Sequence, residues 1–160
     1  MRVKLSPYAQ PEDLPSPDTL PAQVFRKIAA EILRDGKMLR FAAYGNSMRP
    51  QIQHGDIITI KPISHLPRVG DVIMIITDAA TAKIMVHRIA ARTATTITTR
   101  GDACTTPDGE FPHSAILGIL ARVERNGTPV NWVLPWHMHL HPQFRQILRK
   151  LYYRMKGGRS

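Results

Sequence analysis

Between residues 38 and 131 the chain is built from short runs of β-branched and apolar residues, each closed by turn-forming residues. The runs lie at 39–43, 56–61, 71–77, 83–91, 95–99 and 116–123. The pairs that separate them are Gly45-Asn46, Gly55-Asp56, Gly70-Asp71, Gly101-Asp102 and Asn126-Gly127. Many short strands at this spacing are typical of an all-β sheet or barrel. This pattern predicts a mainly β domain over 38–131.

A helical pattern precedes this domain. The apolar residues that recur at three- and four-residue spacing are Val24, Phe25, Ile28, Ala29, Ile32 and Leu33. Asp18 or Thr19 suits the start of this helix, Pro21 its first turn and Gly36 its end. We expect the helix over 22–35 to cover one side of the core, with docking to a partner as the alternative. Residues 1–21 are rich in proline and indicate an extended arm.

The C-terminal part has a different texture. Residues 132–142 form an aromatic connector bounded by prolines, and residues 143–156 show an amphipathic helical pattern that Gly157-Gly158 ends. A length of 160 residues corresponds to about one domain. We therefore divide the chain into an N-terminal arm and helix (1–37), a β domain (38–131), and a connector with a basic helix (132–160).

The positive charge is uneven. The chain holds 22 Lys and Arg against 12 Asp and Glu, for a net charge of +10. Six of these cations and no acid lie in 143–160, so the remainder is only mildly basic. Three interpretations of the basic helix stay open: it packs on the core, it lies on an anionic membrane with Trp132, Trp136, Tyr152 and Tyr153 as anchors, or it binds an acidic partner or nucleic acid. Nucleic-acid binding is not expected of the domain as a whole.

The cysteine, the clustered histidines and the apolar runs limit the expected metal sites, disulfides and cellular location. The single cysteine, Cys104, excludes an internal disulfide and a four-cysteine zinc site. His137, His139 and His141 alternate between prolines without a carboxylate or cysteine nearby, so no metal site and no cofactor are expected. No apolar run approaches the roughly 20 residues of a spanning helix, and no secretion signal is visible. We expect a cytoplasmic protein that does not cross the membrane.

One turn carries a candidate nucleophilic serine. Ser47 follows Gly45-Asn46 directly after a predicted strand, where a turn exposes its hydroxyl and frees backbone N–H groups. Such a serine needs a base, and Lys83 and His87 share one face of a later strand. A carboxylate, Asp102 or Asp108, would orient the histidine. On these residues alone, a β domain without hydrolase chemistry is favoured.

The order of the motifs adds a resemblance. The blocks concerned are Gly45-Asn46-Ser47-Met48-Arg49-Pro50, Gly55-Asp56-Ile57-Ile58, Val69-Gly70-Asp71-Val72-Ile73, Val86-His87-Arg88-Ile89, and Thr99-Arg100-Gly101-Asp102 with Asp108 and Ile116-Leu117-Gly118 beyond it. In this order they resemble the signal peptidase I superfamily of serine peptidases, which includes the LexA-like self-cleaving repressors. The resemblance covers roughly residues 39–123.

The resemblance implies a fold and a mechanism. The fold is the complex coiled β-sheet of that superfamily, here with flanking N-terminal and C-terminal helices, and 38–131 is its catalytic domain. Ser47 is the nucleophile in a turn with Gly45, Asn46 and Met48, and its backbone N–H helps to hold the oxyanion. His87 stands at the base position, as in the archaeal, spore-former and endoplasmic-reticulum subgroup. Asp102 and Asp108 both match acidic positions of that subgroup, and the choice between them stays open.

The sequence also departs from its relatives. It lacks their spanning helix, and Gly45 replaces a serine that many of them carry. Residues 1–38 offer one helix rather than a helix-turn-helix, so a self-cleaving repressor is not expected. The sequence thus predicts a soluble or membrane-peripheral serine endopeptidase that cleaves a precursor or leader peptide. The alternative is a catalytically inactive member of the fold, serving as a peptide-binding or assembly module.

Overall fold

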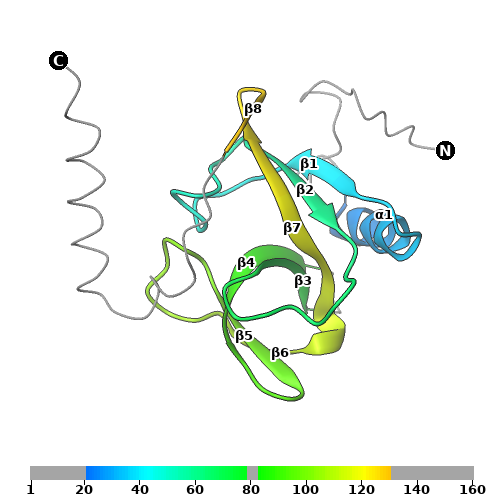
Figure 1. Cartoon of the computed structure of the whole chain (residues 1–160), viewed down its shortest axis with the longest axis vertical. Coiled ribbons are helices and arrows are strands. Elements are labelled where there is room, and N and C mark those ends of the chain that lie inside the picture. Colours follow the sequence, from blue (N-terminus) through cyan, green and yellow to red (C-terminus); the bar gives the residue numbers. More distant parts are fainter. Residues whose placement is uncertain (1–20, 79–82, 131–160) are drawn as a thin grey trace.

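The computed structural model describes residues 21–78 and 83–130 (Figure 1). Its elements, in chain order, are α1 (Ala22–Arg34), β1 (Leu39–Ala42), β2 (Ile57–Lys61), β3 (Val72–Asp78), β4 (Lys83–Arg92), β5 (Thr96–Arg100), β6 (Gly109–Pro112), the 3-10 turn η2 (His113–Ala115), β7 (Ile116–Arg125) and β8 (Thr128–Pro129). The predicted mainly β fold is confirmed. The predicted arm, the aromatic connector with its three histidines and the basic C-terminal helix lie outside the described residues.

All eight strands belong to one curled antiparallel sheet, ordered β1-β2-β7-β3-β4-β5-β6, with β8 paired to β7 (Figure 1). The long strand β7 runs through its middle and pairs with β2 on one side and β3 on the other. Gly118 permits the pairing with β2, because a Cβ there would lie 2.5 Å from Ile60 Cγ2. Among the described strands, β7 thus joins the β1–β2 half to the β3–β6 half.

Helix α1 covers part of this sheet. Its buried residues Phe25, Ala29 and Leu33 follow the predicted spacing, and Phe25 packs edge to face on Phe41 of β1 with ring centroids 5.3 Å apart. Burial of one such aromatic side chain is worth about 1.5–3 kcal/mol. The helix therefore serves the core, as predicted. Within the residues described, α1 is too short and too polar to span a bilayer.

The ends of α1 differ slightly from the prediction. Pro21 is the N-cap residue rather than part of the first turn, and its carbonyl accepts hydrogen bonds from the N–H groups of Val24 and Phe25. The predicted caps Asp18 and Thr19 lie outside the described residues. Gly36 adopts φ +75°, a left-handed conformation that favours glycine, and ends the helix as predicted.

Two glycine-aspartate turns share one hydrogen-bond pattern. In Gln53–Asp56 the aspartate N–H donates to the Gln53 carbonyl, and its carboxylate accepts the Gln53 N–H at 2.8 Å. In Arg68–Asp71 the aspartate makes the same two bonds to Arg68. Gly55 and Gly70 have φ of +86° and +99°, which explains the glycine in each pair. These turns start β2 and β3 and so fix the two strands that flank β7.

Six strands lie where the residue pattern predicts them, with ends shifted by one or two residues. The pattern did not predict β6 and β8. Strand β6 is Gly-Glu-Phe-Pro with three of its four residues exposed, so it lacks apolar alternation. Strand β8 has two residues and is held by the Asn126-Gly127 turn, in which both residues have positive φ.

Candidate active site

Ser47 lies in the turn between β1 and β2, where it is partly exposed. Gly45 has φ +97°, a left-handed conformation that favours glycine, so a serine at this position would be strained. The Asn46 carbonyl accepts the Arg49 N–H, and the buried Met48 side chain anchors the turn in the main core. These contacts hold the hydroxyl at the surface on a fixed backbone.

His87 lies on β4, opposite Ile73 of β3, and is 6% exposed. Its Nε2 is 2.7 Å from Ser47 Oγ, and its Nδ1 is 2.6 Å from Asp108 Oδ2. An ionised carboxylate only accepts hydrogen bonds, so Nδ1 carries the proton in the neutral ring. The lone pair of Nε2 is then free to accept the Ser47 O–H.

The structure distinguishes the two carboxylates that the sequence left open. Asp108 pairs with His87, whereas Asp102 accepts two hydrogen bonds from Arg88, Nε to Oδ1 at 2.7 Å and Nη2 to Oδ2 at 2.6 Å. Ser47, His87 and Asp108 thus form one hydrogen-bonded chain, and Asp102 belongs to a separate ion pair. Lys83, the other candidate base, is exposed at the start of β4.

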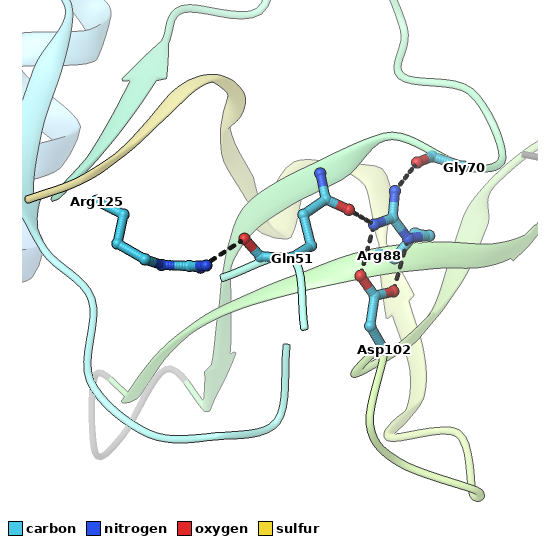
Figure 2. Close-up of polar contacts among 5 residues, drawn as sticks. All are labelled: Gln51, Gly70, Arg88, Asp102 and Arg125. Carbon is cyan, nitrogen blue, oxygen red and sulfur yellow. Dashed lines mark hydrogen bonds and ion pairs between the residues drawn. The ribbon is translucent and has the colours of Figure 1, made fainter. Parts of the chain in front are cut away.

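Arg88 connects four segments around this chain of hydrogen bonds (Figure 2). Besides Asp102, its guanidinium donates through Nη1 to the Gly70 carbonyl at 2.7 Å and through Nη2 to the Gln51 side-chain carbonyl. Arg88 and Asp102 are 8% and 7% exposed, so the pair is removed from water. A bidentate pair of this kind fixes geometry as well as charge. Arg88 therefore links Gln51, in the nucleophile turn (residues 45–52), to the strand that carries His87.

The turn at 101–104 packs against Ser47. The Ala103 N–H donates to the Ser47 carbonyl at 2.8 Å, and the Cys104 N–H donates to the Gly101 carbonyl at 3.0 Å. A Cβ on Gly101 would lie 2.6 Å from the Ser47 carbonyl oxygen and 2.9 Å from Cys104 Sγ. Only glycine allows this approach. The half-buried Cys104 is thus a packing residue of the turn.

The turn that holds Ser47 has several backbone N–H groups without a backbone acceptor among the described residues, those of Asn46, Ser47 and Met48 included. Within the described residues, the Ser47 N–H donates to no backbone carbonyl, whereas the Ser47 carbonyl is already paired with Ala103. An N–H group in this position is able to bind a developing oxyanion.

A cavity of about 250 Å³ opens beside Ser47 and His87. Its walls come from the end of β1, the nucleophile turn and the first half of β4. The apolar side chains among them include Phe41, Met48, Ile52, Ile84 and Val86. An apolar hollow beside Ser47 and His87 is able to hold a small hydrophobic group.

Three polar residues of this region carried no role in the sequence analysis. Thr99 donates to Asp108 Oδ2 at 2.9 Å, Gln51 accepts from Arg88, and Arg125 pairs with Asp56. Thr99 lies two residues from the buried Ile97 on β5, and a polar residue on a buried face signals a need for a partner. Nothing comparable in the sequence marks Gln51.

Arg125 supports the nucleophile turn from β7. Its guanidinium pairs with the buried Asp56, Nε to Oδ1 at 2.8 Å and Nη2 to Oδ2 at 2.7 Å. Figure 2 shows its further contact, from Nη2 to the Gln51 backbone carbonyl at 3.4 Å. The hydrogen bond to Asp56 raises the pKa of Arg125 above its ordinary value. The pairing with Asp56 therefore favours the charged form of the guanidinium.

The sequence matches one known protein family. No curated protein matches the chain. The Peptidase S24-like family matches residues 15–119, roughly two thirds of the chain, and the matched segment holds Ser47, His87 and Asp108. The resemblance to the signal peptidase and LexA superfamily is confirmed at that level. The chain therefore belongs to the Peptidase S24-like family.

Proposed function

We propose that this protein is a serine endopeptidase in which Ser47 is the nucleophile, His87 the general base and Asp108 the residue that orients His87. The observation that carries the proposal is the continuous hydrogen-bond chain, Ser47 Oγ to His87 Nε2 at 2.7 Å and His87 Nδ1 to Asp108 Oδ2 at 2.6 Å. These distances are those of a nucleophile and a base within proton-transfer reach.

In the proposed reaction, Ser47 Oγ bonds to the carbonyl carbon of a peptide bond while its proton passes to His87 Nε2. The tetrahedral intermediate then breaks its C–N bond, and Nε2 returns the proton to the leaving amine. Water attacks the resulting ester with His87 again as the base, which releases the acid and regenerates Ser47. Asp108 stabilises the imidazolium in both halves of the reaction.

The Ser47 N–H is the proposed oxyanion donor, because it makes no backbone hydrogen bond among the residues described and belongs to the residue whose Oγ would attack the substrate carbonyl. Gly45 carries no side chain, so the hydroxyl donor that a serine there would supply is missing. We infer a backbone-based oxyanion site in this chain.

The proposed substrate is a precursor or leader peptide that places a small apolar side chain in the cavity beside Ser47. The apolar walls and the modest volume of about 250 Å³ support this choice. The histidine base supports placement of the chain beside the archaeal, spore-former and endoplasmic-reticulum subgroup that the sequence resembles.

A fluorophosphonate probe tests the proposal, because it phosphonylates an activated serine whatever the natural substrate is. We expect the wild-type chain to be labelled and Ser47→Ala to be unlabelled. Ser64→Ala is the matched control: Ser64 Oγ also lies 3.1 Å from a histidine nitrogen, on His65, but both residues are exposed. Labelling of Ser64→Ala should equal that of the wild type.

The same experiment decides against the peptidase if folded wild-type protein takes up no probe, or if Ser47→Ala is labelled equally. Binding of small apolar peptides without Ser47-dependent labelling would then favour the inactive peptide-binding module.

A further inference from the structure

We propose that Thr99 is a positioning residue of the active site, which holds the Asp108 carboxylate so that Oδ2 faces His87. This inference rests on the proposed function, since it assigns a fourth member to the chain of Ser47, His87 and Asp108. Thr99 acts through Asp108 and does not touch the reacting atoms.

Thr99 contacts Asp108 through both its side chain and its backbone. The Thr99 hydroxyl donates to Asp108 Oδ2 at 2.9 Å, and the Thr99 carbonyl accepts the Asp108 N–H at 2.9 Å. The Thr99 side chain is completely buried, whereas the Asp108 side chain is 19% exposed. The buried Thr99 therefore holds the Asp108 carboxylate in place, which would otherwise be free to turn toward water.

The sheet register explains why Thr99 occupies this place. In β5, Thr99 lies opposite Ile89 of β4 and opposite Gly109 of β6, so it stands between the strand of His87 and the residue that follows Asp108. Gly109 has φ +127°, a conformation that side chains rarely adopt, and this lets the chain turn into β6 directly after Asp108. Thr99 and Asp108 thus meet because β5 and β6 pair in this register.

The hydrogen bond from Thr99 fixes the orientation of the Asp108 carboxylate through its Oδ2 atom. One oxygen accepts from both His87 Nδ1 and the Thr99 hydroxyl. The hydroxyl rotates freely about its C–O bond, but its oxygen is fixed by burial, so it selects one orientation of the carboxylate plane. When His87 takes the Ser47 proton, the carboxylate is then already aligned with the imidazolium, and no reorientation is needed.

The main test compares Thr99→Val with Thr99→Ser. Valine replaces the hydroxyl with a methyl group of similar size, whereas serine keeps the hydroxyl and removes the methyl group. We expect Thr99→Val to slow fluorophosphonate labelling of Ser47 about tenfold, which matches the loss of one hydrogen bond to a charged group. Thr99→Ser should retain a rate within about threefold of the wild type.

A matched control is available on the same strand. Thr98 lies on the other face of β5, next to Thr99, and is partly exposed. Thr98→Val makes the same chemical change one position away, and it should leave the labelling rate unchanged. Equal slowing in Thr98→Val and Thr99→Val would assign the effect to strand stability and overturn the proposal.

A second readout does not depend on peptidase activity. A short hydrogen bond from a protonated histidine to a carboxylate gives a proton NMR signal far downfield, and the His87 Nδ1–H should show it. We expect Thr99→Val to shift this signal upfield or broaden it, while Thr99→Ser and Thr98→Val preserve it. An unchanged signal in folded Thr99→Val would overturn the proposal.

These two readouts separate the possible failures. If the wild-type chain takes up no probe, the proposed function fails, and the NMR signal alone decides whether Thr99 orients Asp108. If Thr99→Val does not fold, Thr99→Ser and Thr99→Ala replace the main pair, because these two variants differ only in the hydroxyl oxygen. Equal NMR signals and equal labelling in that pair would likewise contradict the proposal.

Discussion

Arg88 and Asp102 form a buried ion pair in which both carboxylate oxygens are used, at 2.7 and 2.6 Å from Nε and Nη2. Arg88 directly follows His87 in the chain, so the pair begins one residue from the proposed base. Asp108, six residues beyond Asp102, is the carboxylate that meets the histidine. The two aspartates therefore have separate partners, Arg88 for Asp102 and His87 for Asp108.

The first prediction separates these two aspartates. Asp108→Asn should fold normally but lose about 10⁴-fold in Ser47 reactivity, because an amide favours the wrong histidine tautomer. Asp102→Asn should lower the free energy of unfolding by about 3–5 kcal/mol, since it leaves the buried Arg88 without its counter-charge. Urea unfolding and probe labelling of both variants measure the two effects. The opposite assignment, with reactivity lost only in stable Asp102→Asn, would refute this division.

The second prediction concerns the approach of Gly101 to Ser47. Gly101→Ala would place a methyl group 2.6 Å from the Ser47 carbonyl oxygen, so the nucleophile turn must shift. We expect a loss of about 1–3 kcal/mol of stability together with a strong loss of labelling. Gly127→Ala is the control, because φ +73° strains that site too while no atom crowds its Cβ. Normal labelling of folded Gly101→Ala would contradict the close packing.

The third prediction concerns Gly45, where many relatives carry serine. Gly45→Ser adds a hydroxyl near the proposed oxyanion site, but the residue must adopt φ +97°. We expect a cost of about 1–3 kcal/mol in unfolding free energy and no gain in labelling rate. Thermal unfolding and labelling kinetics of this single variant are sufficient. Faster labelling without loss of stability would show that a side-chain oxyanion donor fits this turn.

The fourth prediction concerns Arg125. Arg125→Met leaves Asp56, which is 3% exposed, with an unpaired charge, and we expect a loss of about 3–5 kcal/mol. Arg122→Met is the matched control, because Arg122 is 55% exposed and its pair with Glu124 spans 3.3 Å. That change should cost less than about 1 kcal/mol. Equal losses in the two variants would mean that burial does not govern these pairs.

The pH dependence of the Arg125 pair follows from the direction of its pKa shift. Asp56 raises the pKa of Arg125 in the folded state, so the associated stability is present below the unfolded-state pKa and is lost only as pH rises through the folded value. Moderate alkali should therefore leave the stability difference between wild type and Arg125→Met unchanged. A difference that shrinks in moderate alkali would contradict the stated direction.

The fifth prediction concerns the basic segment 143–160, which lies outside the described residues. If it binds an anionic membrane surface, the full chain should sediment with vesicles that contain anionic lipid, and binding should weaken as salt is added. Deletion of 143–160 should abolish this binding. Equal binding after the deletion would remove the membrane interpretation of the segment.

Much of the fold is readable from local pattern. The strands β1 to β5 and β7 are predictable because apolar residues recur between turn-forming residues. Gly55 and Gly70 mark turns that require a positive φ. Strand β6 is not predictable from its residues, because it forms through its pairing with β5 rather than through a pattern of its own.

The candidate site was predictable in its residue types but not in its pairings. Asp102 and Asp108 both follow His87 at plausible distances, and only the fold of the 101–104 turn directs Asp102 to Arg88. Gln51 and Thr99 were missed for the same reason, because their partners lie 37 and 9 residues away in the sequence. Contacts of this kind depend on which strands become neighbours.

The central position of β7 has a consequence for synthesis on the ribosome. Ser47 belongs to the β1–β2 half of the sheet and His87 to the β3–β6 half, and β7 is the strand that pairs with both halves. Yet β7 follows every proposed catalytic residue in the chain. A nascent chain that has emerged only as far as Asp108 therefore holds all its reactive groups without the strand that brings them into register. We therefore expect the proposed catalytic site to assemble only after β7, and with it nearly the whole sheet, has left the exit tunnel.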